Sequence, residues 1–211
     1  MVDRTYVEPI RDFFQRYGWS FAWLLLALIG LYRISDIVLG VISNVFYKDL
    51  GFEKSQIADV VIVFGIVMTI VGGLLGGLLA ARIGVIRILL LGGVLAAATN
   101  LLFMLLAGIG NDMFWFYVVI SADNLSAGIA SAAFVAFLSS LTNVSFTAMQ
   151  YAIFSSLMTL VPKSLGGYSG SMVNAIGYPN FFLLTALLGL PVLLLIVLAA
   201  KRFEIRDQAK G

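Results

Sequence analysis

Four charged residues lie inside long apolar stretches of this sequence, and they are its strongest candidates for chemistry. They are Arg33, Asp36, Asp123 and Lys163. An ionised side chain at the centre of a bilayer costs about 2.5–3.5 kcal/mol, so it persists only beside a partner or a water-filled cavity. The four charges therefore indicate a pathway through a membrane.

Three of these charges also have a purely structural explanation. Asp36 lies one helical turn from Arg33, so the two can form an ion pair that only neutralises both charges. Lys163 follows Pro162 and can extend its long side chain toward the membrane surface. Asp123 has no basic residue in its own apolar stretch, which implies a partner on another helix or a water-filled cavity.

The composition places these residues in a polytopic all-α membrane protein. The 211 residues are 61% hydrophobic and only 11% charged, and the mean hydropathy is +1.04. A transmembrane helix needs about 20 mainly apolar residues. The sequence predicts six such spans, near 19–46, 57–80, 86–108, 113–138, 147–173 and 180–200.

The chain contains no Cys and no His. It therefore has neither disulfides nor thiolate metal sites, and it lacks the commonest metal ligand and proton carrier. We expect no metal site, no cofactor and no nucleic-acid partner, so that proton chemistry falls to carboxylates.

The basic residues predict the orientation of the spans. One side of the membrane receives nine of them, namely Arg4, Arg11, Arg16, Arg82, Arg87, Lys201, Arg202, Arg206 and Lys210. The other side receives only Lys48 and Lys54. The excess of Lys and Arg on cytoplasmic loops then places both termini, and the tail 201–211, in the cytoplasm.

The segment 1–18 precedes the first span and has the pattern of a short amphipathic helix. Pro9 suits a first helical turn, Phe13 and Tyr17 recur at helical spacing, and Gly18 can end the helix. We expect this helix to lie on the cytoplasmic surface of the membrane. The alternative is a solvated leader.

Small and polar residues form stripes along several spans. The first, fourth and fifth spans carry polar stripes that must meet one another or water. The second span carries a stripe of small residues that predicts close helix packing rather than a ligand site, namely Gly65, Thr69, Gly72, Gly73, Gly76, Gly77 and Ala80.

The segment 77–87, GLLAARIGVIR, resembles the cytoplasmic loop signature GxLaDRxGRRx of the major facilitator superfamily. Gly77, Arg82, Gly84 and Arg87 match, whereas Ala81 replaces the usual Asp. The runs 123–137 and 145–152 are similar to the carboxy-terminal half of the AmpG-type muropeptide permeases. The resemblance covers essentially the whole chain.

The resemblance implies one six-helix half of a transporter, built as two inverted three-helix repeats, 19–108 and 113–200. Permeases of this kind import anhydro-muropeptides across the bacterial inner membrane by proton symport for peptidoglycan recycling. Because full members have at least twelve helices, we expect a fragment or split product that requires an amino-terminal half. A dimer and a non-functional half are the alternatives.

The implied substrate is a small anionic glycopeptide, and it suggests roles for individual residues. Arg33 and Lys163 would recognise its carboxylates, and Asp123 or Asp36 would carry the coupling proton. The remaining candidates would hydrogen-bond sugar or peptide groups; they are Asn124, Gln150, Tyr151 and Ser156. Carriers of acetyl-CoA or siderophores in the same superfamily are alternatives.

Enzymes and channels fit the sequence less well. Rhomboid-type serine chemistry needs a general base, and with no His in the chain that role is unfilled. An intramembrane aspartyl protease would use Asp36 and Asp123, but the Gly-x-Gly-Asp context is missing and Arg33 favours an ionised Asp36. A channel would need a filter or a charge ring, and neither pattern is present. We therefore expect a transporter and not an enzyme.

Overall fold

The computed structural model describes residues 7–208, which form helices and short connections without a strand. Within these residues six segments are long and apolar enough to cross a membrane, which confirms the predicted all-α fold with six spans. The spans are Trp19–Asp49, Lys54–Ile83, Val85–Ile109, Met113–Leu141, Val144–Gly166 and Ser169–Ile205.

Several of the spans are not single continuous α-helices; the sixth, for example, is kinked at Gly177, which has φ 77° and ψ 164°. The first is divided into α2 (Trp19–Leu31) and α3 (Ile34–Asp49), and the second contains α4, a π-helical segment and α5. The other elements are α1 (Glu8–Tyr17), α4 (Lys54–Ile57), the π-helix (Ala58–Phe64), α5 (Gly65–Ile83), α6 (Val85–Ile109), α7 (Met113–Leu141), a 3₁₀ turn (Val144–Phe146), α8 (Thr147–Gly166) and α9 (Ser169–Gln208).

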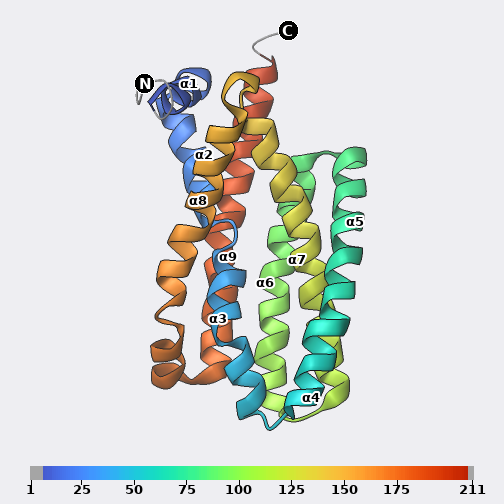
Figure 1. Cartoon of the computed structure of the whole chain (residues 1–211). Coiled ribbons are helices and arrows are strands. Elements are labelled where there is room, and N and C mark those ends of the chain that lie inside the picture. The colour runs from blue at the N-terminus through green and yellow to red at the C-terminus, as the bar shows by residue number, and fades with distance from the viewer. Residues whose placement is uncertain (1–6, 209–211) are drawn as a thin grey trace.

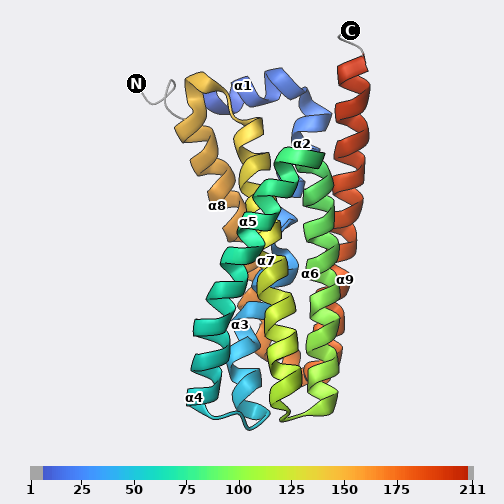
Figure 2. The same ribbon diagram turned by 90° about the vertical axis from the view of Figure 1, so that its right-hand side faces the viewer.

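The helix α1 lies across one end of the bundle, where the carboxy-terminal part of α9 also ends (Figures 1 and 2). We call this the α1 end. Gly18 alone separates α1 from α2, and its positive φ of 78° is a conformation that favours glycine. The helix α4 lies at the opposite end.

The first span is interrupted where the sequence predicts a continuous helix over 19–46. Arg33 has φ −95° and ψ 11°, so the helical hydrogen bonding stops there and resumes at Ile34. Tyr32 is anchored from two sides: its ring stacks on Phe134 of α7 at 4.6 Å, and its hydroxyl donates to the carbonyl of Leu89 in α6 at 3.1 Å. The break therefore packs against the third and fourth spans, which contain α6 and α7.

The stripe of small residues on α5 packs against α7, as the sequence predicts. A Cβ at Gly72 would meet the backbone of Leu125, and a Cβ at Gly128 would meet the carbonyl of Thr69. Gly73, in contrast, has no atom within 4 Å of its Cβ position. The close approach of α5 to α7 thus depends on the small residues on one face of α5.

The spans differ widely in how much of their surface the bundle covers. In their most apolar windows, half of the residues of the first and fourth spans are buried. The corresponding shares are 22% for the second span and 11% for the fifth, which contains α8. These two spans leave most of their surface to lipid or to another protein.

Candidate functional site

Arg33 joins the break in the first span to the fourth span. Its Nη1 donates a hydrogen bond of 2.7 Å to Ser131 Oγ on α7. Its Nε lies 3.2 Å from Asp36 Oδ2 in the first turn of α3. Because Asp36 lies near the amino-terminal end of α3, the helix dipole adds to the stabilisation of its negative charge.

The Arg33–Asp36 pair remains reachable from outside the bundle. The two side chains keep 23% and 15% of their exposure. The contact is an ion pair rather than a hydrogen bond, since the buried Nε of Arg33 has no acceptor in a suitable direction. The guanidinium is thus held by Ser131 and Asp36 without being enclosed.

Asp123 lies in the electrostatic range of this pair. Its Oδ1 accepts a hydrogen bond of 3.4 Å from Thr99 Oγ1 on α6. The charges of Asp36 and Arg33 both act on it. The cross-helix partner expected for Asp123 is therefore a hydroxyl group, with the cation one helix away.

Further polar groups lie buried around these charges. Asn100 Nδ2 donates to Ser35 Oγ at 2.7 Å, and Ser35 in turn donates to the carbonyl of Thr185 at 2.5 Å. Asn100 Oδ1 and Ser126 Oγ are buried without a partner in the structure. Our sequence analysis missed Asn100, although a lone Asn in an apolar span is a usable signal.

Asn124 connects α7 to α5 instead of facing an open site. Its Oδ1 accepts from Thr69 Oγ1 at 3.0 Å, and its Nδ2 donates to the carbonyl of Ile120 at 2.9 Å. A Cβ at Gly65 would lie 3.2 Å from this amide, so the glycine makes room for it. The structure thus engages Asn124 in helix packing.

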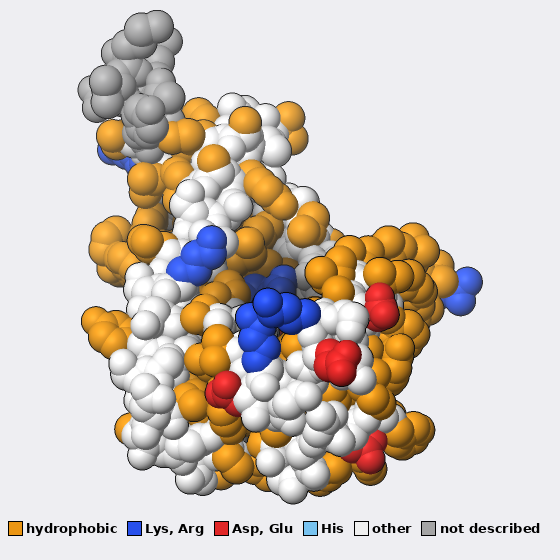
Figure 3. Space-filling view, turned by 60° about the horizontal axis from the view of Figure 1, so that its bottom comes forward, with side chains coloured by type: hydrophobic (Ala, Val, Ile, Leu, Met, Phe, Trp, Pro, Cys, Tyr) orange, Lys and Arg blue, Asp and Glu red, His pale blue; other side chains and the backbone are white. Residues whose placement is uncertain are grey.

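The candidates on α8 do not all lie together. Lys163 is exposed and lines an open depression of about 480 Å³ together with Ser156 and Thr159. Tyr151 packs against the apolar core. Figure 3 shows Lys and Arg side chains around a hollow near the end opposite α1, with Asp and Glu side chains close to them.

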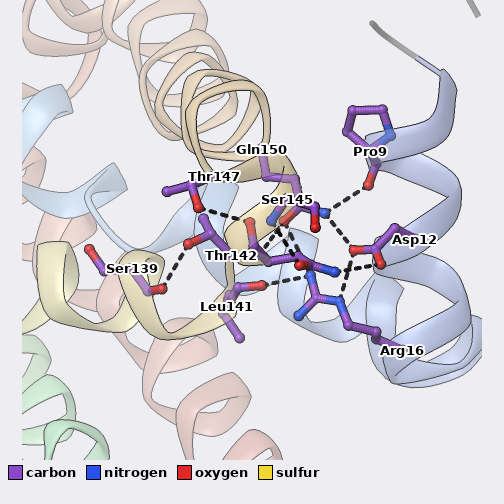
Figure 4. Close-up of polar contacts among 10 residues, drawn as sticks. Pro9, Asp12, Arg16, Ser139, Leu141, Thr142, Ser145, Thr147 and Gln150 are labelled. Carbon is purple, nitrogen blue, oxygen red and sulfur yellow. Dashed lines mark hydrogen bonds and ion pairs between the residues drawn. The ribbon is translucent and has the colours of Figure 1, made fainter. Parts of the chain in front are cut away.

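Gln150 lies at the α1 end and is only 1% exposed. Its amide is bonded to α1, through Pro9 and Asp12 (Figure 4). The structure therefore does not bring Gln150 together with Arg33. Its partners are more than 130 residues away in the chain, which is why the sequence alone did not reveal them.

The loop signature lies between α5 and α6, also at the α1 end (Figures 1 and 2). Arg82 and Arg87 are exposed there. Gly84 has φ 96°, which a residue with a side chain rarely adopts and which turns the chain from one helix to the next. Gly77 has open space around its Cβ position.

A six-span bundle with charged residues at a break in a membrane-spanning helix is an arrangement that membrane transporters use. The sequence profile described as the Major Facilitator Superfamily matches residues 13–210. The chain belongs to this superfamily.

Curated relatives give the comparison finer detail. The chain is 32% identical over 204 residues to the anhydromuropeptide permease of Escherichia coli K12, covering 96% of this chain and 41% of that protein. It is 31% identical over 193 residues to a Rickettsia conorii protein that carries the name AmpG 4, covering 92% and 46%. A Rickettsia bellii protein named AmpG 1 is 34% identical over 178 residues, covering 84% and 43%. The chain thus spans less than half the length of these relatives.

Proposed function

We propose that this chain forms one half of a proton-coupled permease that imports anhydromuropeptides across the bacterial inner membrane. The observation that supports it most is Arg33, which is held by Ser131 and Asp36 at a break in the first span and remains partly exposed. Interrupted helices near the middle of the membrane are where transporters of this construction place their substrate.

The substrate class follows from the chemistry of Arg33 and from the named relatives. A planar guanidinium binds a carboxylate through two parallel hydrogen bonds. The Escherichia coli relative is named for anhydromuropeptides, and the peptide part of such a compound carries carboxylates. Lys163 offers a second, exposed cation on α8 for the same anionic ligand.

Proton coupling is assigned to Asp123, with Asp36 as the second carboxylate. Asp123 has only a long hydrogen bond from Thr99 and no ion pair of its own among the described residues. A carboxyl group in that position can exchange a proton without breaking a salt bridge. Asp36, in contrast, would first have to separate from Arg33.

The partner is an amino-terminal six-helix half that covers the open faces of α5 and α8. These faces expose large apolar side chains such as Leu74 and Leu160, which keep 72% and 65% of their accessible surface. The polar groups Lys163 and Thr159 lie beside Leu160. Two facing halves would enclose those polar groups, whereas a single half leaves them against lipid.

Both termini are placed in the cytoplasm, so the α1 end faces inward. Nine basic residues are assigned to this side and two, Lys48 and Lys54, to the other. Compartment-reporting fusions at Gly211 and Asn111 should give opposite signals. Equal signals would contradict this orientation.

Uptake of labelled anhydromuropeptide by permease-deficient cells tests the function. Uptake should require co-expression of an amino-terminal half and should fail with Arg33→Ala. In binding measurements, Arg33→Ala should weaken a carboxylate-bearing substrate far more than a carboxylate-free analogue. If Arg33→Ala combined with Asp36→Ala recovers the lost uptake, Arg33 only neutralises Asp36 and the binding role is wrong.

A further inference from the structure

A cluster of four polar side chains fastens α1 to the start of α8. Asp12 and Arg16 belong to α1 and Gln150 to the first turn of α8 (Figure 4). Asn143 belongs to the connection between α7 and α8. We call this cluster the clasp. It joins segments that are 131–138 residues apart in the chain.

Gln150 is the centre of the clasp because both ends of its amide are used twice. Its Nε2 donates to the carbonyl of Pro9 at 2.8 Å and to Asp12 Oδ2 at 2.9 Å. Its Oε1 accepts from the backbone N–H of Asn143 at 2.7 Å and from Arg16 Nη2 at 3.2 Å. A buried amide with all four contacts made is a strong positional constraint.

The other members close the clasp onto the end of α7. Asn143 Nδ2 donates to Asp12 Oδ1 at 2.8 Å, and Arg16 Nε donates to Asp12 Oδ2 at 2.8 Å. Arg16 Nη2 also donates to the carbonyl of Leu141, in the last turn of α7, at 3.0 Å. A cation at a helix carboxy terminus is favoured by the helix dipole.

Between α8 and α2 the packing is open. A groove of about 850 Å³, lined almost wholly by apolar residues, runs from α1 along these two helices. Leu157 of α8 and Gly30 of α2 both line this groove, and Leu157 lies in van der Waals contact with the Cβ position of Gly30. The part of α8 from Thr147 to Leu157 is thus held by the clasp at one end and by the contact with Gly30 at the other, with Phe154 packed on Phe13 of α1 between them, and the groove runs between it and α2.

We propose that the clasp sets the tilt of this part of α8, with Gln150 as the positioning residue and the groove as the space into which α8 moves when the clasp opens. Ser156 lines the groove, so its position follows the same tilt. The consequence for substrate binding rests on the proposed function. The tilt itself does not, and it can be measured without substrate.

Spin-label distances test the proposal directly. Because the chain contains no Cys, labels can be attached at Ala81→Cys and Ala148→Cys, two exposed positions near the α1 ends of α5 and α8. The full chain is measured in lipid nanodiscs by double electron–electron resonance. With no other substitution in the chain, we expect a narrow distribution of the distance between the two labels.

Gln150→Leu removes the four contacts at nearly constant volume and should shift or clearly broaden the Ala81–Ala148 distribution. Gln15→Leu is the matched control, since Gln15 is an exposed glutamine on α1, and it should leave the distribution unchanged. An unchanged distribution in Gln150→Leu overturns the proposal. If that variant does not fold, Asp12→Asn takes its place with the same two outcomes.

Discussion

Ser131 Oγ accepts a hydrogen bond of 2.7 Å from Arg33 Nη1, and this bond joins the first span to the fourth. Any relative movement of α3 and α7 must therefore keep the bond or replace it. A substrate carboxylate can bind the remaining N–H groups of the guanidinium while Ser131 holds Nη1 in place.

Ser131→Ala should weaken binding of a carboxylate-bearing substrate about tenfold, because a hydrogen bond to a charged group contributes about 1.5–3 kcal/mol and only part of it is lost when the guanidinium finds another acceptor. Isothermal titration of the assembled transporter measures this. Ser126→Ala on the same helix is the control, since Ser126 Oγ has no partner in the structure. Equal losses in both variants would show that Ser131 does not act through Arg33.

Asp123→Asn should separate transport from coupling. Substrate exchange at equilibrium should persist, because Asn keeps the size of the side chain and can still accept from Thr99. Accumulation against a gradient should disappear, because the amide cannot carry a proton. Both are read from labelled uptake in proteoliposomes with and without a proton gradient. If the variant still concentrates substrate, Asp36 is the remaining carboxylate to test.

The packing of α5 on α7 offers a test with two adjacent glycines. Gly72→Ala places a methyl group against the backbone of Leu125 and should destabilise the bundle by about 1–3 kcal/mol, as overpacking usually does. Gly73→Ala faces open space and should be neutral or stabilise the helix by about 0.5–1 kcal/mol. Unfolding followed in detergent measures both. Similar effects at the two positions would contradict the close contact.

The clasp should loosen at low pH. Burial alone would raise the pKa of Asp12, but hydrogen bonds from Gln150, Asn143 and Arg16, with the charge of Arg16, outweigh it and hold the pKa below the ordinary value of 3.8. A carboxylate with a depressed pKa stabilises the folded state above its ordinary pKa, and this contribution is lost as the pH falls through the lowered value.

We therefore expect spin labels at Arg11→Cys and Ala148→Cys to keep a narrow distribution from about pH 7 down to about pH 4 and to broaden below that. The control is Asp12→Asn, which has no carboxylate to protonate at this position and should show no such transition. A transition of the same size in Asp12→Asn would assign the effect to another group, such as Glu8.

The six spans, with Arg33, Asp36 and Asp123 inside them, could be predicted because both the length of an apolar stretch and the charges within it can be read from the local sequence. The break at Tyr32 could not, since neither residue at the break, Tyr32 or Arg33, is a Pro or Gly. It depends on Phe134 and Leu89, which are distant in the chain. The same holds for Gln150: its residue type suggested hydrogen bonding, but only the fold shows that its partners belong to α1.

Because only Gly18 separates α1 from α2, a movement of α1 is transmitted directly to the first span. Through Gly18, α1 is covalently joined to the first span, and through Gln150 it is fastened to the fifth. Arg16, whose Nη2 donates to the carbonyl of Leu141, also fastens α1 to the end of the fourth span. A displacement of α1 would therefore act on three spans at once, one through a peptide bond and two through hydrogen bonds.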